Sequence, residues 1–325
     1  MYGDALGSRL LREEGKGKNM LTIVDLALQV LDDVIMTRWK VLPREQCLGN
    51  LYLERYASFT FDLTILGIRN FIVNFIIESS KSEESLRSER AFLNKLNLVL
   101  VSILKQEWPH NWPTFINEII SSCHTSLSIC ENNMAILRLL SEEVFDFSQD
   151  QMTSVKARNL KTSMTHEFSS IFQLCSEVLG TANQPTLVKA TLETLLRFLN
   201  WIPLGYIFET PIISTLLTRF LEIPEFRNVT LKCLTEIGGL QIGSPYNYDE
   251  RLVHMFTETL TIVSKTIPLS MDLKQIFAKS NSRDQEFVLN LALFLCSFFS
   301  AHLDVCVEYR ASTDLSAWHT NKYAR

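Results

Sequence analysis

Trp108-Pro109-His110-Asn111-Trp112-Pro113 carries two Trp-Pro pairs four residues apart, between an apolar run at Leu93–Leu104 and another that starts at Phe115. Proline cannot donate a backbone hydrogen bond, and it disfavours the helical conformation of the residue before it. The first pair therefore ends one helix, and the second can open the next because proline suits the first helical position. This stretch predicts a stiff turn between two antiparallel helices, with both indoles packed against neighbouring helices.

The role of this turn has two interpretations. The first is structural and concerns Trp108, Pro109, Trp112 and Pro113, because aromatic anchors at the turns of helical repeats mainly pack. The alternative is functional, and in that case the exposed tip at residues 110–111 touches a partner. We favour the structural interpretation.

Outward from this turn, apolar residues recur at steps of three and four, which is the period of an amphipathic helix. Gly and Pro are few, at 11 and 9 residues. The expected helices span residues 21–40, 91–108, 115–123, 132–147, 153–179, 185–202, 212–221, 226–238, 249–266 and 284–303. Helix pairs recur about every 40–58 residues, which overlaps the period of HEAT and armadillo arrays. The expected fold class is all-α, a right-handed α-solenoid of HEAT-like helix pairs, with a closed helical bundle as the alternative.

The composition narrows the possible functions. The net charge of −5 and the lack of long basic stretches argue against nucleic acid as a direct partner. Seven widely spaced cysteines without a CxxC pattern indicate reduced, buried thiols. The most apolar stretch, residues 288–303, is interrupted by Asn290, Ser297 and Ser300. We therefore expect a fully buried helix there and no membrane partner.

Three segments depart from the helical rhythm. Residues 1–19 mix glycine with charges and are expected to be disordered. Residues 48–67 are aromatic and β-branched, and this atypical insert could be a loop, a helix or a strand. Residues 304–325 lose the apolar pattern and are expected to form an irregular tail, which leaves the last helix without a neighbour. Between the two ends we expect one group of HEAT repeats at 20–123 and further repeats at 124–303.

The sequence lacks the patterns that carry catalysis. It has no GxxxxGK[ST] phosphate loop and no GxSxG elbow, and His166-Glu167 has no second histidine at metalloprotease spacing. The six histidines are scattered, which favours surface roles over metal binding. Glu142-Glu143 and Asp146 favour a solvated face or salt links between helices. We expect no enzyme activity, and we predict no catalytic residue, metal or cofactor.

Several longer stretches carry a resemblance that covers most of residues 28–303 and is interrupted at 48–67. The stretches are Trp39–Pro43, Lys95–Pro109, Trp112–Ile116, Leu139–Ser148, Ala190–Thr210 and Phe226–Ile237. They resemble the exportins, which are nuclear export receptors of the importin-β superfamily. The resemblance implies that the chain is an N-terminal HEAT-repeat portion of such a receptor.

The resemblance also implies partners. In this family the first repeats bind the small GTPase Ran in its GTP form through their inner helices, and the outer helices offer shallow clefts to Phe-Gly nucleoporins. Export cargo binds in central repeats beyond this chain, so cargo contact is expected only through those missing repeats. The implied location is the nucleus and the cytoplasm, with shuttling through the nuclear pore.

The Ran-facing residues are expected by position on two helices. They are polar residues that lie off the apolar rows of these helices: Asn117, Glu118, Lys156, Asn159, Ser163 and His166. A solvated face is the alternative role for any one of them. The insert at 48–67 falls on the same inner side, and the first helix pair of the family is replaced by residues 1–19. The alternative function is therefore a truncated or mis-spliced solenoid with only a scaffold role and no Ran binding.

Overall fold

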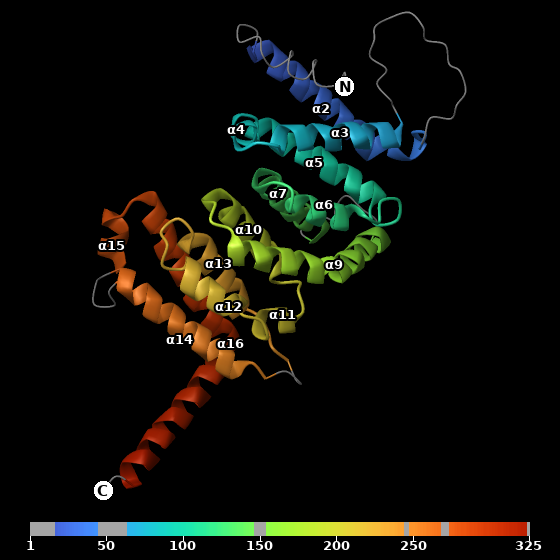
Figure 1. Cartoon of the computed structure of the whole chain (residues 1–325). Helices are drawn as coiled ribbons and strands as arrows, with labels where there is room; N and C mark the ends of the chain where they lie inside the picture. The colour runs from blue at the N-terminus through green and yellow to red at the C-terminus, as the bar shows by residue number, and fades with distance from the viewer. Residues whose placement is uncertain (1–16, 45–63, 146–153, 244–246, 268–272, 324–325) are drawn as a thin grey trace, which may run out of the picture. The chain divides into compact units, whose positions relative to one another are not determined.

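The computed structural model describes residues 17–44, 64–145, 154–243, 247–267 and 273–323 of the chain. Every regular element in these ranges is helical, as Figure 1 shows. The all-α class is therefore confirmed. The helices form two compact units, Met1–Lys161 and Thr162–Arg325. The units divide inside one helix, whereas the sequence suggested a boundary between residues 123 and 124.

Unit 1 is built around its central helix, α5. Its elements are α2 (Gly17–Arg38), the 3-10 turn η1 (Trp39–Val41), α3 (Ile65–Ser80), α4 (Glu83–Ser88), α5 (Arg90–Glu107), α6 (Phe115–Cys123), α7 (Leu127–Phe145) and the start of α9. Helix α5 packs against α2, α3 and α7, and α6 packs against α7. Its apolar residues are buried on more than one side, including Leu93, Val99, Val101 and Ile103. Burial on more than one side is typical of a helix in the centre of a helical stack.

Polar contacts fix the register of α5 against α7. The side chains of Asn97 and Asn132 exchange two amide hydrogen bonds, at 2.8 and 3.2 Å, and both residues are buried. Lys105 Nζ donates to Glu143 Oε2 at 2.7 Å. The expected salt link between helices is therefore confirmed for Glu143, and Asp146 lies outside the described residues.

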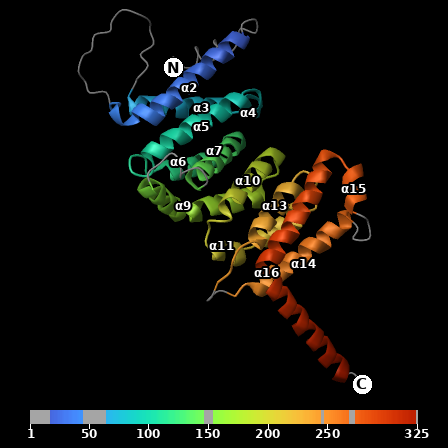
Figure 2. The same cartoon turned by 180° about the vertical axis from the view of Figure 1, so that it is seen from behind.

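Unit 2 is organised around α13. Its elements are the rest of α9 (Ser154–Thr181), α10 (Pro185–Phe198), α11 (Leu204–Phe208), α12 (Ile212–Thr215), the π-helical turn η2 (Leu216–Phe220), α13 (Arg227–Gly238), α14 (Asp249–Thr266), α15 (Leu273–Lys279) and α16 (Ser282–Tyr323). Helix α13 packs against α10, α16 and η2. Figure 2 shows α13, α14 and α16 together in unit 2.

Two glycines allow α13 to approach α16 closely. A Cβ atom on Gly238 would lie 3.2 Å from the ring of Phe298, and one on Gly239 would lie 2.5 Å from Ser297 Oγ. The second distance is below normal van der Waals contact. Larger residues at these positions would therefore push the two helices apart.

The π-helical turn η2 positions an arginine that caps another helix. Arg219 Nη1 donates to the carbonyl oxygens of Leu179 at 2.7 Å and Gly180 at 2.6 Å, at the end of α9. The last carbonyls of a helix have no partner within the helix, so this side chain satisfies two of them. The sequence predicted one helix over 212–221, without the π-helical turn.

The three segments expected to be irregular behave differently from one another. Helix α2 begins at Gly17, so residues 17–19 are helical, and the rest of the expected disordered segment lies outside the described residues. Residues 65–67 of the insert begin α3, where Thr64 Oγ1 accepts from the Gly67 backbone N–H at 3.0 Å. The remainder of the insert, apart from Thr64, also lies outside the described residues.

The expectation of an irregular tail after residue 303 is wrong. Helix α16 continues to Tyr323, with one non-helical residue at His302 (φ −136°, ψ 27°). Residues 304–323 contain neither Gly nor Pro, so the backbone can stay helical after the apolar rhythm ends. In both views the end of α16 projects from the other helices of unit 2 (Figures 1 and 2).

The apolar stretch of α16 is not fully buried, contrary to expectation. Leu289, Leu293 and Leu303 are 55%, 60% and 56% exposed, because only one face of the helix packs against unit 2. The segment Ser282–Val305 is long and apolar enough to cross a membrane, with a mean hydropathy of 1.7, and 28% of its most apolar window is buried. Within the described residues, one face of this helix is thus exposed, as expected.

Candidate functional site

The Trp-Pro turn forms a packed corner between α5 and α6. Trp108 and Trp112 are 3% and 7% exposed, and the Trp108–Pro109 peptide bond is cis. The Trp112 ring meets Phe115 edge-on at 5.0 Å, and the Arg69 guanidinium lies 4.5 Å from the Trp112 ring centroid. These contacts agree with the structural interpretation of the corner. The tip at residues 110–111 is exposed.

A buried carboxylate ties this corner to η1. Glu107 is 3% exposed, and its Oε1 accepts from Trp39 Nε1 at 2.9 Å. Arg44 Nη2 lies 3.5 Å from the same oxygen. Glu107 and Trp39 are 68 residues apart, so no local spacing in the sequence indicates their contact. The sequence reasoning missed this residue, although it quoted both flanking stretches.

The two candidate residues on α6 differ in what they contact. Asn117 and Glu118 are both exposed. Glu118 Oε2 accepts from Trp112 Nε1 at 3.0 Å, and its Oε1 accepts from Thr114 Oγ1 at 2.5 Å. Glu118 therefore helps to hold the start of α6 in place, and a partner would have to compete with these two hydrogen bonds.

The four candidates on α9 share one helix face. Residues 156, 159, 163 and 166 follow one another at steps of three and four, which places them on one side of a helix. Asn159 and His166 are exposed and Ser163 is half-buried. The side chain of Lys156 lies outside the described residues. The structure thus aligns these four positions on α9, separate from the two candidates on α6.

Another side of α9 is apolar, as the sequence predicted. Its expected apolar row is buried throughout: Leu160, Met164, Phe168, Ile171 and Cys175. The Phe168 ring meets Phe198 of α10 edge-on at 5.6 Å. This packing anchors the helix, while Asn159 and His166 on its polar side are exposed.

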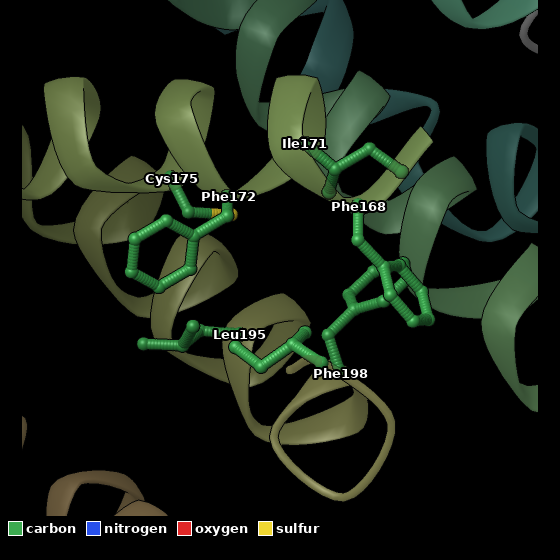
Figure 3. A pocket seen from close by; sticks show the side chains of 7 residues that line it. Phe168, Ile171, Phe172, Cys175, Leu195 and Phe198 are labelled. Atoms are coloured by element: carbon green, nitrogen blue, oxygen red, sulfur yellow. The ribbon is translucent and has the colours of Figure 1, made fainter. Parts of the chain in front are cut away.

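A small gap lies between α9 and α10, and Figure 3 shows its lining. The lining side chains are Phe168, Ile171, Phe172, Cys175, Leu195, Phe198 and Ile202. The gap measures about 10 Å³ and is entirely apolar. Ligand pockets are usually larger than about 300 Å³. We therefore interpret it as a packing defect of the core.

The described thiols follow the sequence prediction with one exception. Cys123, Cys130, Cys175 and Cys233 are buried and are not disulfide-bonded, and Cys296 is exposed. Burial raises the pKa of the Cys233 thiol far above its ordinary value. Within the described residues no three His, Cys, Asp or Glu side chains gather as a metal site.

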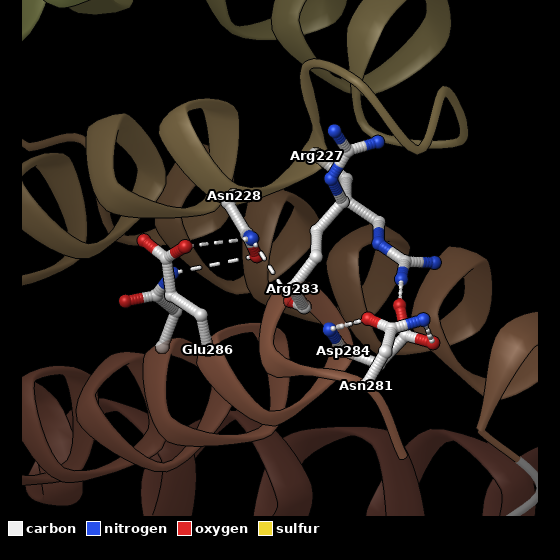
Figure 4. A network of polar contacts seen from close by, with 7 residues as sticks. Arg227, Asn228, Asn281, Arg283, Asp284 and Glu286 are labelled. Carbon is white, nitrogen blue, oxygen red and sulfur yellow. Dashed lines mark hydrogen bonds and ion pairs between the residues drawn. The ribbon is translucent and has the colours of Figure 1, made fainter.

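A polar network joins α13 to the start of α16 (Figure 4). Arg227 pairs with Asp284, and its guanidinium lies 4.6 Å from the Phe287 ring centroid. Asn228 Nδ2 donates to the Arg283 carbonyl at 3.1 Å and to Glu286 Oε2 at 3.2 Å. These contacts hold α16 firmly against α13.

A lysine on α13 completes this network. Lys232 Nζ donates to Glu286 Oε1 at 2.8 Å. This hydrogen bond lowers the pKa of Glu286 below its usual range. The Glu286 carboxylate therefore accepts from two residues of α13, Asn228 and Lys232.

The stacked helix pairs, the tiny apolar gap and the polar faces define a helical-repeat protein of the HEAT type, a class that works through its surfaces. A family model described as Exportin 1-like protein matches residues 89–234. Exportin-1 of Schizosaccharomyces pombe is 53% identical over 86% of this chain, and Exportin-1 of Drosophila melanogaster is 49% identical over 85%. The chain belongs to the exportin-1 family.

The relatives extend across kingdoms and are much longer than this chain. Protein EXPORTIN 1B of Arabidopsis thaliana is 42% identical over 86% of the chain. The alignments cover 24% of each of these three relatives. The chain thus spans about a quarter of the length of the relatives that it matches.

Proposed function

We propose that this chain is the N-terminal portion of a nuclear export receptor and that it binds the small GTPase Ran in its GTP form. The observation that carries the proposal is the 53% identity to an exportin-1 over 86% of the chain. The family-model match, residues 89–234, includes the helices α6 and α9 that present the candidate residues. The polar side of α9 and the exposed residues of α6 are the proposed contact.

The surface chemistry of α9 supports this assignment. Asn159 and His166 offer amide and imidazole groups on one exposed face, and the apolar row on the other side is buried. A rigid helix that presents aligned polar groups can bind a protein surface without first being ordered. Asn117 adds an exposed amide on α6.

The remaining partners follow from the same proposal. Phe-Gly nucleoporins would bind apolar clefts between outer helices, and export cargo would bind only through repeats that this chain does not contain. The chain would act by binding and not by catalysis, and it would shuttle between nucleus and cytoplasm through the nuclear pore.

The decisive experiment compares Ran loaded with GTP and with GDP. The purified 325-residue chain is titrated against each form, and affinity is measured by calorimetry. We expect binding to the GTP form and at least about tenfold weaker binding to the GDP form, equivalent to about 1.4 kcal/mol. Equal binding to both forms, or binding to neither, supports the scaffold alternative instead.

A matched pair of variants tests the proposed face. The double variant Asn159→Ala, His166→Ala removes two exposed polar groups from the α9 face, and we expect it to weaken Ran-GTP binding. Thr165→Ala removes a polar group from another exposed side of the same helix and should leave the affinity unchanged. Equal losses in both variants would contradict the assignment of this face.

A further inference from the structure

A basic turn lies at residues 38–44, at the end of α2 and around η1. It exposes three cationic side chains, Arg38, Lys40 and Arg44, in a chain whose net charge is −5. Arg38 and Lys40 form no ion pair with any other residue that the structure describes. Arg44 Nη2 lies 3.5 Å from Glu107 Oε1, and 56% of the arginine side chain is still exposed. The turn is therefore a local concentration of positive charge.

The acidic residues described near this turn do not cancel its charge. On α2, Asp33 precedes Arg38 by five residues, which is more than one helical turn. Glu107 is 3% exposed, and its Oε1 already accepts from Trp39 Nε1 at 2.9 Å. A ligand that approaches the basic turn from solvent would therefore meet mainly positive groups.

The same turn presents an apolar side chain. Val41 is 79% exposed, more than any other large apolar side chain in the described part of the chain. A single exposed apolar residue is ordinary on a protein surface. Val41, however, follows Lys40 directly and stands three residues from both Arg38 and Arg44. A ligand at the turn can therefore make an apolar contact and several ionic contacts together.

Two other helices hold the basic turn in place. On one side, the hydrogen bond from Trp39 ties it to Glu107 of α5. On the other side, the backbone N–H of Ile65, the first residue of α3, donates to the Pro43 carbonyl at 2.9 Å. The N–H of Leu66 also donates to the Arg44 carbonyl, at 3.4 Å. A surface that is already ordered loses less conformational entropy when it binds a ligand.

The chemistry of the turn favours an acidic polypeptide over a nucleic acid. Both kinds of ligand would satisfy the cations. Single-stranded nucleic acids, however, also need exposed aromatic rings on which bases stack. The one aromatic residue of the turn, Trp39, is 3% exposed and is engaged with Glu107. Val41 instead offers the kind of contact that an aliphatic side chain of a polypeptide can make.

We propose that the basic turn binds an acidic segment of a partner protein. Carboxylates of that segment pair with Arg38 and Lys40, and one of its apolar side chains covers Val41. This surface goes beyond the proposed Ran contact, which uses α6 and α9. Because the turn is small and exposed, the complex should be weak, short-lived and sensitive to salt.

The first test measures binding of a defined probe to the full 325-residue chain by fluorescence anisotropy. The probe is a fluorescein-labelled peptide of glutamates with one central leucine. We expect binding that weakens at least about threefold between about 50 mM and about 300 mM salt. A peptide with lysines in place of the glutamates should not bind. A peptide with glutamine in place of the leucine should bind more weakly.

Paired variants locate the contact. The double variant Arg38→Glu, Lys40→Glu should weaken probe binding at least about fivefold. Its matched control, Lys189→Glu with Arg251→Glu, reverses two exposed cations of unit 2 and should leave the affinity of the probe unchanged.

A second pair tests the apolar contact. Val41→Ser should weaken binding of the leucine probe and leave binding of the glutamine probe unchanged. The control is Val155→Ser, at a valine of α9 that is 58% exposed. All four positions changed in the double variants and both valines are exposed, so the helical spectrum of each variant should match that of the unaltered chain.

A third test maps the contact directly. A photoreactive benzoylphenylalanine replaces the central leucine of the probe, and irradiation links it to a nearby C–H bond of the chain. We expect the linked peptide to contain residues 38–44.

The results that would overturn the proposal are specific. Absence of probe binding, equal binding of the lysine peptide, or equal losses in a variant and its control would each do so. A cross-link outside residues 38–44 would reject the location. Tighter binding of a single-stranded oligonucleotide than of the glutamate peptide, lost in Arg38→Glu, Lys40→Glu, would show that the turn binds nucleic acid instead. The probe contains no Ran, so none of these results bears on the proposed contact of α6 and α9.

Discussion

At the scale of single residues, Glu107 is the group that joins distant parts of unit 1. Its buried carboxylate accepts the indole N–H of Trp39, and the guanidinium of Arg44 lies nearby. A buried indole N–H without an acceptor loses its hydrogen bond to water and gains nothing in return. Glu107 therefore links the Trp-Pro corner to η1.

Replacing this carboxylate should destabilise the fold. We expect Glu107→Ala to lower the free energy of unfolding of unit 1 by about 1–3 kcal/mol, because Trp39 Nε1 then lacks an acceptor. Urea unfolding followed by tryptophan fluorescence measures the change. The control is Glu118→Ala, which removes an exposed carboxylate from Trp112 and should cost less than about 1 kcal/mol. Similar costs for the two variants would contradict the role of Glu107.

At the scale of elements, α16 changes direction at a buried histidine. His302 is 5% exposed, its ring lies 5.4 Å from Phe298, and its Nε2 has no hydrogen-bond partner. Burial lowers the pKa of His302, while the Asp249 carboxylate and the Leu240 carbonyl oppose that shift. Burial therefore disfavours the charged imidazolium at the break in the helix.

This histidine makes the stability of unit 2 depend on pH. The unfolded chain binds the proton near the ordinary pKa of about 6.5, whereas the folded chain binds it only at lower pH. Stability is then greatest above about pH 6.5 and falls as the pH drops toward the folded pKa. Urea midpoints at about pH 7.5 and about pH 5.5 should differ less in His302→Gln than in the unaltered chain. The exposed His254→Gln is the control, and it should keep the full difference.

The sequence predicted the helices well where a buried face makes apolar residues recur at steps of three and four. The expected helices 115–123 and 249–266 match α6 and α14 at both ends. It failed at α16, which continues beyond residue 303 although the apolar period of the sequence ends there. It also placed the start of α7 five residues late, at Asn132 instead of Leu127. An apolar period reports burial on one side, and it says little about where a helix stops.

The candidate site was predicted only in part, for a related reason. The alignment of residues 159, 163 and 166 on α9 follows from helical spacing, so the sequence could supply it. The hydrogen bonds of Glu118 reach residues four and six positions away and depend on the conformation of the Trp-Pro turn. The contact of Glu107 with Trp39 joins residues 68 positions apart and depends on tertiary packing. A contact between residues so far apart leaves no local sequence pattern from which it could be predicted.

At the scale of the whole molecule, the chain consists of two compact units that each have a buried core. The second unit begins within α9, whose Phe168 and Phe172 pack against Phe198 and Tyr206. A unit that contains its own core can fold alone when its helices remain whole. Helix α9 should therefore be kept complete in any separated second unit.

We expect a fragment of residues 154–325 to fold by itself. Circular dichroism should show a helical spectrum and a single cooperative thermal transition, because the fragment keeps all of α9. The control is a fragment of residues 182–325, which lacks α9 and exposes the partners of Phe168 and Phe172. A broad, non-cooperative melt of the longer fragment would show that the second unit needs the first.

The cysteines differ in exposure, so one of them can be labelled selectively with a fluorescent dye. Among the five cysteines whose side chains are described, only Cys296 is exposed, and the thiol of Cys233 is kept protonated by burial. A maleimide dye should therefore react at Cys296 well before the four buried thiols. Because this position lies on one face of a fixed helix, the emission of the dye would change whenever another surface covers that face.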